Sequence, residues 1–115
     1  MKESPNIFKV LSDPNRLRII KMLQSRPLCG CEIMSILNLA ASTVSQHLNL
    51  LKKAGFIIEK KEGRWTNYYI NRSANDARVI AILTSLDFWI GDLDKIDEDR
   101  INLKSVNRHL IKCKK

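Results

Sequence analysis

Two thiols flank a single glycine at residues 29–31, which read Cys-Gly-Cys. Thiolates are soft ligands, and they favour soft, thiophilic ions over hard ions such as magnesium or calcium. Residues two apart in a regular helix point about 200° away from each other, so Cys29 and Cys31 can hold one ion only where the backbone is not helical. Gly30 makes such a distortion easier because glycine accepts unusual backbone angles. The spacing predicts a soft-ion or redox site that would pull on the start of the following helix.

A third cysteine, Cys113, lies in the C-terminal tail. An odd number of cysteines in a reducing compartment indicates thiols that remain available as ligands or redox groups, and not a disulfide framework. Cys113 completes a three-thiolate site with Cys29 and Cys31 only if the tail folds back, in the same or the partner subunit. Two alternatives stay open: a single cysteine is often a compact apolar filler, and paired thiols beside Arg26 could act by oxidation.

Short polar side chains gather on one face of the segment from residue 42 to residue 54. Val44, Leu48 and Leu51 recur at helical spacing and are expected to face the core. The remaining face carries hydroxyl and amide groups, which allow close approach to a major groove and can pair with base edges. Ser42 is better explained as a helix N-cap than as a base contact. The candidate DNA-binding residues are Ser42, Thr43, Ser45, Gln46, His47, Asn49, Lys52 and Arg64.

His47 and Arg64 differ from the other candidates in what they can do. No His or Asp stands near His47 at metal-ligand spacing, so we prefer a DNA contact or local packing over ion binding. Arg64 lies at the tip of a predicted hairpin and suits contact with a phosphate or a minor groove. Lys60 and Lys61 support it electrostatically, although a solvated strand end explains these two lysines as well.

The elements that must position these residues follow from periodicity and from turn residues. A short apolar helix is expected after Pro5, and Asp13-Pro14 is a typical start for the next one. Gly55 is expected to end the polar-faced helix as its C-terminal cap. Alternation then replaces helical spacing, with Glu62-Gly63 as the turn between two strands. The expected helices span residues 14–24, 31–37, 42–54 and 76–93, and the expected strands span residues 56–61 and 65–70.

This order of elements is that of a winged helix-turn-helix: mainly α with a small β-hairpin, in the order α-α-α-α-β-β-α. The long helix over residues 76–93 carries apolar side chains on two sides, so it needs a second partner, and we expect a dimer. We divide the chain into a DNA-binding and dimerisation domain, residues 1–96, and a basic C-terminal tail, residues 97–115. The tail is expected either to form a short amphipathic helix or to stay disordered.

Composition narrows the class of function. The 115 residues carry 20 Lys and Arg against 12 Asp and Glu, a formal charge of +8, and this favours a polyanionic partner such as nucleic acid. No uninterrupted apolar run is long enough to span a membrane, and no secretion signal is visible, so a cytoplasmic protein is expected. Neither histidine is placed beside a nucleophile, and neither a phosphate-cradling glycine loop nor a carboxylate pair is apparent. We therefore do not expect an enzyme.

Residues 11–20 and 42–55 together resemble the ArsR/SmtB family of bacterial metalloregulatory repressors, and the likeness extends over residues 7–93. The resemblance implies a homodimer built from the first and last helices. It also implies a double-stranded operator with inverted half-sites, and repression that is relieved when an inducer binds. No cofactor is implied for DNA binding itself.

Within that family, Cys29-Gly30-Cys31-Glu32 resembles the thiol motif of the arsenic- and cadmium-type sensors. Arsenic-type sensors often carry a third cysteine three residues after the second, where this chain has Met34, a weak thioether donor. Cadmium- and lead-type members use further cysteines near the N-terminus, and zinc-type members use Asp and His pairs on the last long helix; neither set is complete here. These departures favour arsenite or antimonite as the inducer. A thiol-redox repressor, or one that responds to cadmium or lead, is the alternative.

Overall fold

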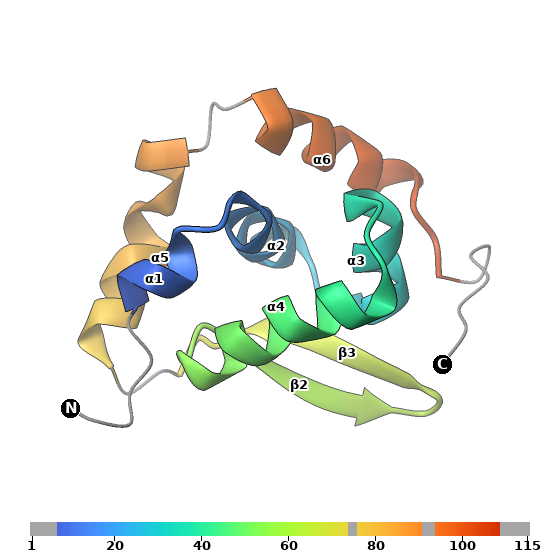
Figure 1. The fold of residues 1–115 in the computed structure, drawn as a ribbon, viewed down its shortest axis with the longest axis horizontal. Helices are drawn as coiled ribbons and strands as arrows, with labels where there is room; N and C mark the ends of the chain where they lie inside the picture. Colours follow the sequence, from blue (N-terminus) through green and yellow to red (C-terminus); the bar gives the residue numbers. More distant parts are fainter. Residues whose placement is uncertain (1–6, 74–75, 91–93, 109–115) are drawn as a thin grey trace.

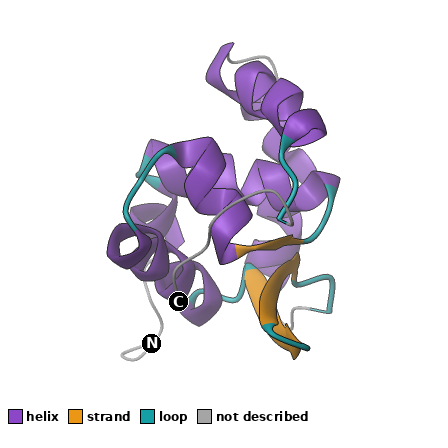
Figure 2. Ribbon diagram, turned by 90° about the vertical axis from the view of Figure 1, so that its right-hand side faces the viewer, coloured by secondary structure: helices purple, strands orange, loops and turns teal. Residues whose placement is uncertain are grey.

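The computed structural model describes residues 7–73, 76–90 and 94–108. A small sheet lies beside a group of helices, and Figure 2 shows the strands confined to one side of a molecule that is otherwise helical. In chain order the elements are α1 (Ile7–Leu11), α2 (Pro14–Ser25), β1 (Leu28–Cys29), α3 (Gly30–Leu37), α4 (Ala41–Lys53), β2 (Ile57–Glu62), β3 (Trp65–Ile70), α5 (Ala77–Ile90) and α6 (Asp94–Ser105). Helices α3 and α4 with the β2–β3 hairpin form a winged helix-turn-helix, which confirms the predicted fold class (Figure 1).

Helix starts and stops follow the turn residues at most positions. The Asp13 side chain accepts a hydrogen bond from the Asn15 N–H at 2.8 Å and caps α2, with Pro14 in the first turn, as predicted. Gly55 follows the C-cap residue of α4, Ala54, with a φ of 90°, a left-handed conformation that favours glycine, and it confirms the predicted stop.

The prediction that Ser42 caps α4 was wrong. The N-cap is Ala40, whose extended backbone precedes the helix, and its carbonyl accepts the first intrahelical bond from the Val44 N–H at 3.0 Å. Helix α4 therefore begins at Ala41, and Ser42 lies exposed in its first turn. This leaves the hydroxyl of Ser42 facing solvent on the same helix as the other polar candidates.

The sheet contains a third strand that the sequence pattern did not predict. Strands β1, β3 and β2 lie in that order and pair antiparallel, with Cys29 opposite Asn67. Strand β1 has only two residues, too few to show alternation. Its pairing places the thiol motif directly beside the wing, which is the β2–β3 hairpin.

The core lies between α2, α4 and the sheet. Val44, Leu48 and Leu51 of α4 are buried, as their spacing predicted. They pack with Ile19 and Ile20 of α2, which are fully buried. This packing fixes the inner face of α4 and leaves its polar face outward.

Helix α6 packs against α2 (Figure 1). Arg18 of α2 donates from Nε and Nη2 to the two carboxylate oxygens of Asp99, at 2.8 and 2.9 Å, and Leu103 is buried nearby. The expected domain boundary after residue 96 falls inside this helix. Of the two expectations for the tail, a helix is present as far as Ser105.

Candidate functional site

The outer face of α4 presents a row of small polar side chains. Ser42, Ser45, Gln46 and Asn49 are exposed, and Thr43 is half-buried. All five come from the predicted DNA-binding set, and their placement follows from the burial of the opposite apolar stripe. Hydroxyl and amide groups arranged in this way can approach and read base edges.

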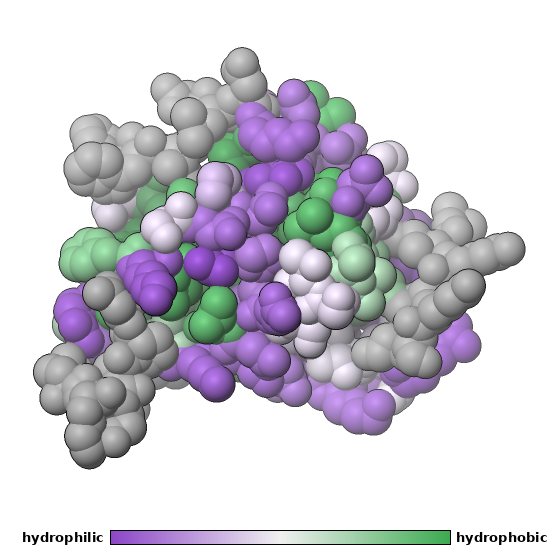
Figure 3. Space-filling view, in the orientation of Figure 1, coloured by the Kyte–Doolittle hydropathy of each residue, from purple (hydrophilic) through white to green (hydrophobic). Residues whose placement is uncertain are grey.

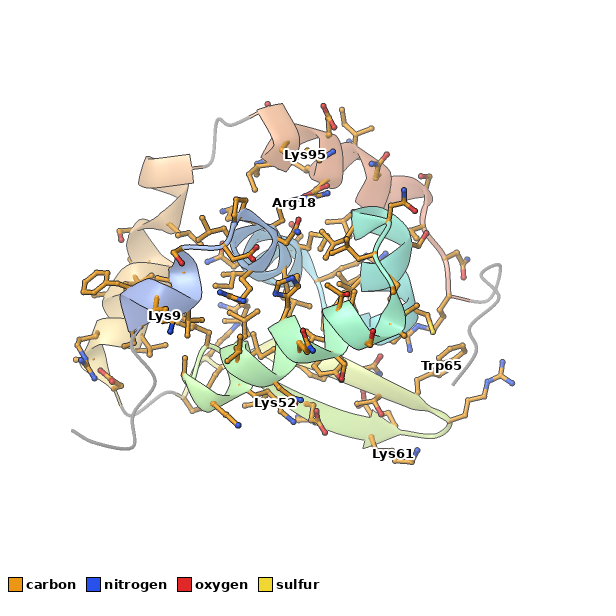
Figure 4. The ribbon with its side chains drawn as sticks, viewed as in Figure 1. Lys9, Arg18, Lys52, Lys61, Trp65 and Lys95 are labelled. Carbon is orange, nitrogen blue, oxygen red and sulfur yellow. The ribbon has the colours of Figure 1, made fainter. Side chains whose placement is uncertain are left out.

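Lys52 joins the end of α4 to the wing. Its Nζ lies 2.8 Å from Oε1 of Glu59 on β2, and both side chains are partly exposed. An exposed ion pair of this kind contributes little to the free energy of folding. It links the end of α4 to β2 without stabilising the fold appreciably. Figure 4 shows Lys52 and Lys61 on the side of the molecule that carries α4 and β2.

His47 lies inside the helix-turn-helix. Only 8% of this residue is exposed, and its Nδ1 lies 3.2 Å from Nη1 of Arg16. A guanidinium only donates, so a hydrogen bond here requires an unprotonated Nδ1. Arg16 also donates from Nε to the Val10 carbonyl at 2.6 Å, and thereby links α1, α2 and α4. This burial favours local packing, one of the two alternatives for His47, over a phosphate contact.

The wing carries exposed positive charge at its end. Arg64 is exposed next to Gly63, which turns the hairpin with a φ of 66°. The Arg64 guanidinium lies 4.9 Å from the centre of the Trp65 ring, and the Lys60 ammonium lies 5.0 Å from that of Tyr69. These stacked cations fit a phosphate-facing edge.

The thiol motif spans the junction of β1 and α3. Cys29 is the N-cap of α3, with an extended backbone at φ −88° and ψ 166°, and Cys31 lies in the first turn. The two residues are buried, at 2% and 4% exposed. The non-helical geometry needed at Cys29 for a two-sulfur clasp is therefore already present.

The two sulfurs are in different states. Cys29 is a free thiol, whereas Cys31 is disulfide-bonded. The expectation that the cysteines remain thiols is therefore wrong for Cys31 in this structure. Cys113 lies outside the described residues. Within the part of the chain that the structure describes, no group of three or more His, Cys, Asp and Glu side chains is arranged to hold a metal ion.

Glu32 is a buried carboxylate that the sequence reading did not single out. Its Oε1 accepts the Cys29 N–H at 2.9 Å and Nη2 of Arg108 at 3.0 Å, and its Oε2 lies 3.5 Å from Nη1 of Arg26. Burial opposes its ionisation, but the hydrogen bond from Cys29 and the contact with Arg108 outweigh burial and lower the pKa of Glu32. The spacing Cys29-x-x-Glu32 is that of a capping box, and this signal could have identified Glu32.

Fold and site together define a winged-helix DNA-binding transcriptional regulator. A family model described as "Bacterial regulatory protein, arsR family" matches residues 13–59. The chain is 41% identical over 87 residues to an HTH-type transcriptional regulator of Methanocaldococcus jannaschii, covering 75% of this chain and 93% of that protein. It is 33% identical to an arsenical resistance operon repressor of Staphylococcus xylosus, covering 65% and 72% of the two chains. The chain belongs to the arsR family.

A cadmium-resistance regulator and two solved winged-helix structures are also similar to this chain. The cadmium resistance regulatory protein CadC of Listeria innocua is 44% identical over 55% of this chain, and the match spans 54% of CadC. The structure of reduced HlyU from Vibrio cholerae has a TM-score of 0.60 and 29% identity, covering 71% of this chain and 82% of that one. A homodimeric winged helix-turn-helix domain of Mycobacterium bovis has a TM-score of 0.60 at 22% identity, covering 71% and 72%, and supports the fold alone.

Among the helices of the described residues, none is both long and apolar enough to cross a lipid bilayer.

Proposed function

We propose that this chain is a transcriptional repressor whose homodimer binds an operator with inverted half-sites. It releases that operator when trivalent arsenic or antimony binds the reduced thiols of Cys29 and Cys31. The observation that carries the proposal is the position of these two cysteines. They lie at the start of α3, the helix that precedes the polar-faced α4, and beside the wing.

The exposed face of α4 supports groove recognition. Ser42, Ser45, Gln46 and Asn49 would face base edges, while Thr43 and Lys52 lie at its border. Arg64 at the end of the wing would contact the phosphate backbone or a minor groove. The formal charge of +8 supports a polyanionic partner.

Exposed apolar side chains on α1 and α5 support a dimer. Phe8 is 80% exposed and Ile80 is 39% exposed, and Figure 3 shows apolar residues at the edge where these helices lie. A dimeric helix-turn-helix protein reads two half-sites one helical turn, about 34 Å, apart, and an operator with inverted half-sites requires such a dimer.

The donor chemistry of the thiol motif fits a soft metalloid. Thiolates bind thiophilic ions, and Glu32 is engaged by Arg26 and Arg108, so sulfur is the donor that remains available. Two conditions apply: Cys31 must be reduced, and the buried first turn of α3 must open. Cys113 would supply a third thiolate if the tail reaches the motif.

The test is a mobility-shift titration of fully reduced protein on operator DNA with arsenite, cadmium or zinc. We expect arsenite to release wild-type protein and to leave the Cys29→Ser complex intact. Release of Cys29→Ser at the same arsenite concentration would remove this thiol from the mechanism.

The disulfide at Cys31 favours a second candidate, a repressor controlled by oxidation. Oxidation would join Cys31 to a second thiol: the pair loses two electrons and two protons to a peroxide, which is reduced to water. The disulfide bond formed in this way would move the first turn of α3. Release by peroxide together with no response of the reduced protein to arsenite would select this candidate. Release of the reduced protein by arsenite, without oxidant, would select the first one.

A further inference from the structure

Arg108, three residues beyond α6, joins three parts of the molecule that are distant in sequence. Its Nη2 donates to Oε1 of Glu32 at 3.0 Å and to Oδ1 of Asn67 at 2.7 Å. Its guanidinium also lies 5.2 Å from the centre of the Trp65 ring. The first turn of α3 and strand β3 of the wing are therefore held by one side chain.

The segment that carries Arg108 is itself anchored. Nη2 of Arg26 donates to the carbonyls of Leu103 and Val106, at 3.3 and 3.4 Å, and the same guanidinium pairs with Glu32. Two arginines thus share one buried carboxylate, which is 3% exposed. A buried charge of this kind depends on its partners, because removing one leaves the carboxylate poorly compensated.

From Asn67 the contacts continue into both strands of the wing. Asn67 is opposite Cys29 in the sheet, and its Nδ2 donates to Oε1 of Glu62 on β2 at 2.6 Å. The Tyr69 hydroxyl donates to the same oxygen at 2.6 Å. The hydrogen bonds from Tyr69 and Asn67 lower the pKa of Glu62 and keep it ionised as an acceptor.

We propose that Arg108 is a positioning residue that couples the thiol motif to the wing. A ligand seated on Cys29 and Cys31 displaces the first turn of α3, and Glu32 moves with that turn. The hydrogen bond from Arg108 to Asn67 and its contact with the Trp65 ring then change, and the wing shifts away from DNA. This inference rests on the proposed function and adds the route by which the signal reaches DNA.

The experiment measures the coupling factor, defined as the operator dissociation constant with arsenite divided by that without arsenite. Fully reduced wild type, Arg108→Gln and Lys104→Gln are compared. Lys104 is an exposed residue of α6, so its variant controls for the loss of one positive charge. Allosteric coupling factors are commonly about 5 to 150. We expect the wild-type factor in Lys104→Gln and a factor close to one in Arg108→Gln, with arsenite still bound by the free protein.

A coupling factor in Arg108→Gln equal to that in Lys104→Gln would overturn the inference. No arsenite response in wild type would instead contradict the proposed function. Glu32→Gln keeps an acceptor for the Cys29 N–H but removes the charge that Arg108 pairs with. This variant replaces Arg108→Gln in the experiment if Arg108→Gln fails to fold. Its coupling factor should also fall, and an unchanged factor would count against the route through Glu32.

Discussion

Glu32 is ionised inside the molecule because its hydrogen bonds with Cys29 and Arg108, and the charge of Arg108, outweigh the cost of burial and lower its pKa. Its folded-state pKa is lowered, so its charge stabilises the fold at pH values above the unfolded pKa. That contribution is lost as the pH falls through the folded pKa. Glu32 also accepts the N–H of Cys29, and stability and thiol position therefore depend on the same carboxylate.

We expect Glu32→Gln to be less stable than wild type by a constant amount between about pH 6 and pH 8. The difference should shrink below the ordinary pKa of 4.5, where the wild-type carboxyl takes up its proton. Urea unfolding across this range measures it, with Glu98→Gln as the exposed control. A difference that grows on acidification would mean that the Glu32 pKa is raised and not lowered.

The elements that could be predicted are those whose own residues specify them. Val44, Leu48 and Leu51 predicted the buried stripe of α4, and Asp13 and Gly55 marked helix ends. Strand β1 could not be predicted, since two residues show no period and the strand exists only through pairing with β3.

The candidate site divides in the same way. The thiols and the polar face of α4 follow from residue type and spacing in adjacent sequence. The contact between Glu32 and Arg108 joins residues that are 76 positions apart in the sequence, and no local sequence pattern predicts a partner at that separation. The same holds for Arg18 and Asp99, which are 81 residues apart.

Attachment of α6 to α2 has a measurable consequence. The side chains of Arg18 and Asp99 are 11% and 3% exposed, and we expect Asp99→Ala to cost about 3–5 kcal/mol because it leaves a largely covered arginine without its carboxylate. Urea unfolding tests this, with Asp97→Ala, on the exposed side of α6, as the control. Equal stability of the two variants would show that the Arg18–Asp99 pair does not stabilise the attachment of α6 to α2.

Charge is distributed over the whole molecule, but its effect on DNA binding depends on place. Figure 4 shows Lys95 on α6, on the opposite side of the molecule from Lys52 and Lys61. A cation that contacts phosphate releases counterions, whereas a distant cation contributes only to the general field.

We expect Arg64→Gln to weaken operator binding and to reduce the slope of log K against log salt by about 0.9. Lys95→Gln should leave the slope unchanged. Fluorescence anisotropy at several salt concentrations measures both variants. Equal slopes for the two variants would mean that the wing does not contact phosphate.

Arsenite binding to the thiols and tight binding of the operator require different positions of the first turn of α3. Thermodynamic linkage then demands that operator DNA weaken arsenite binding by the factor by which arsenite weakens operator binding. The decisive measurement is an arsenite titration of the fully reduced protein, free and saturated with operator. We predict weaker arsenite binding in the complex, by the factor found for DNA release; equal affinity in the two states would contradict it.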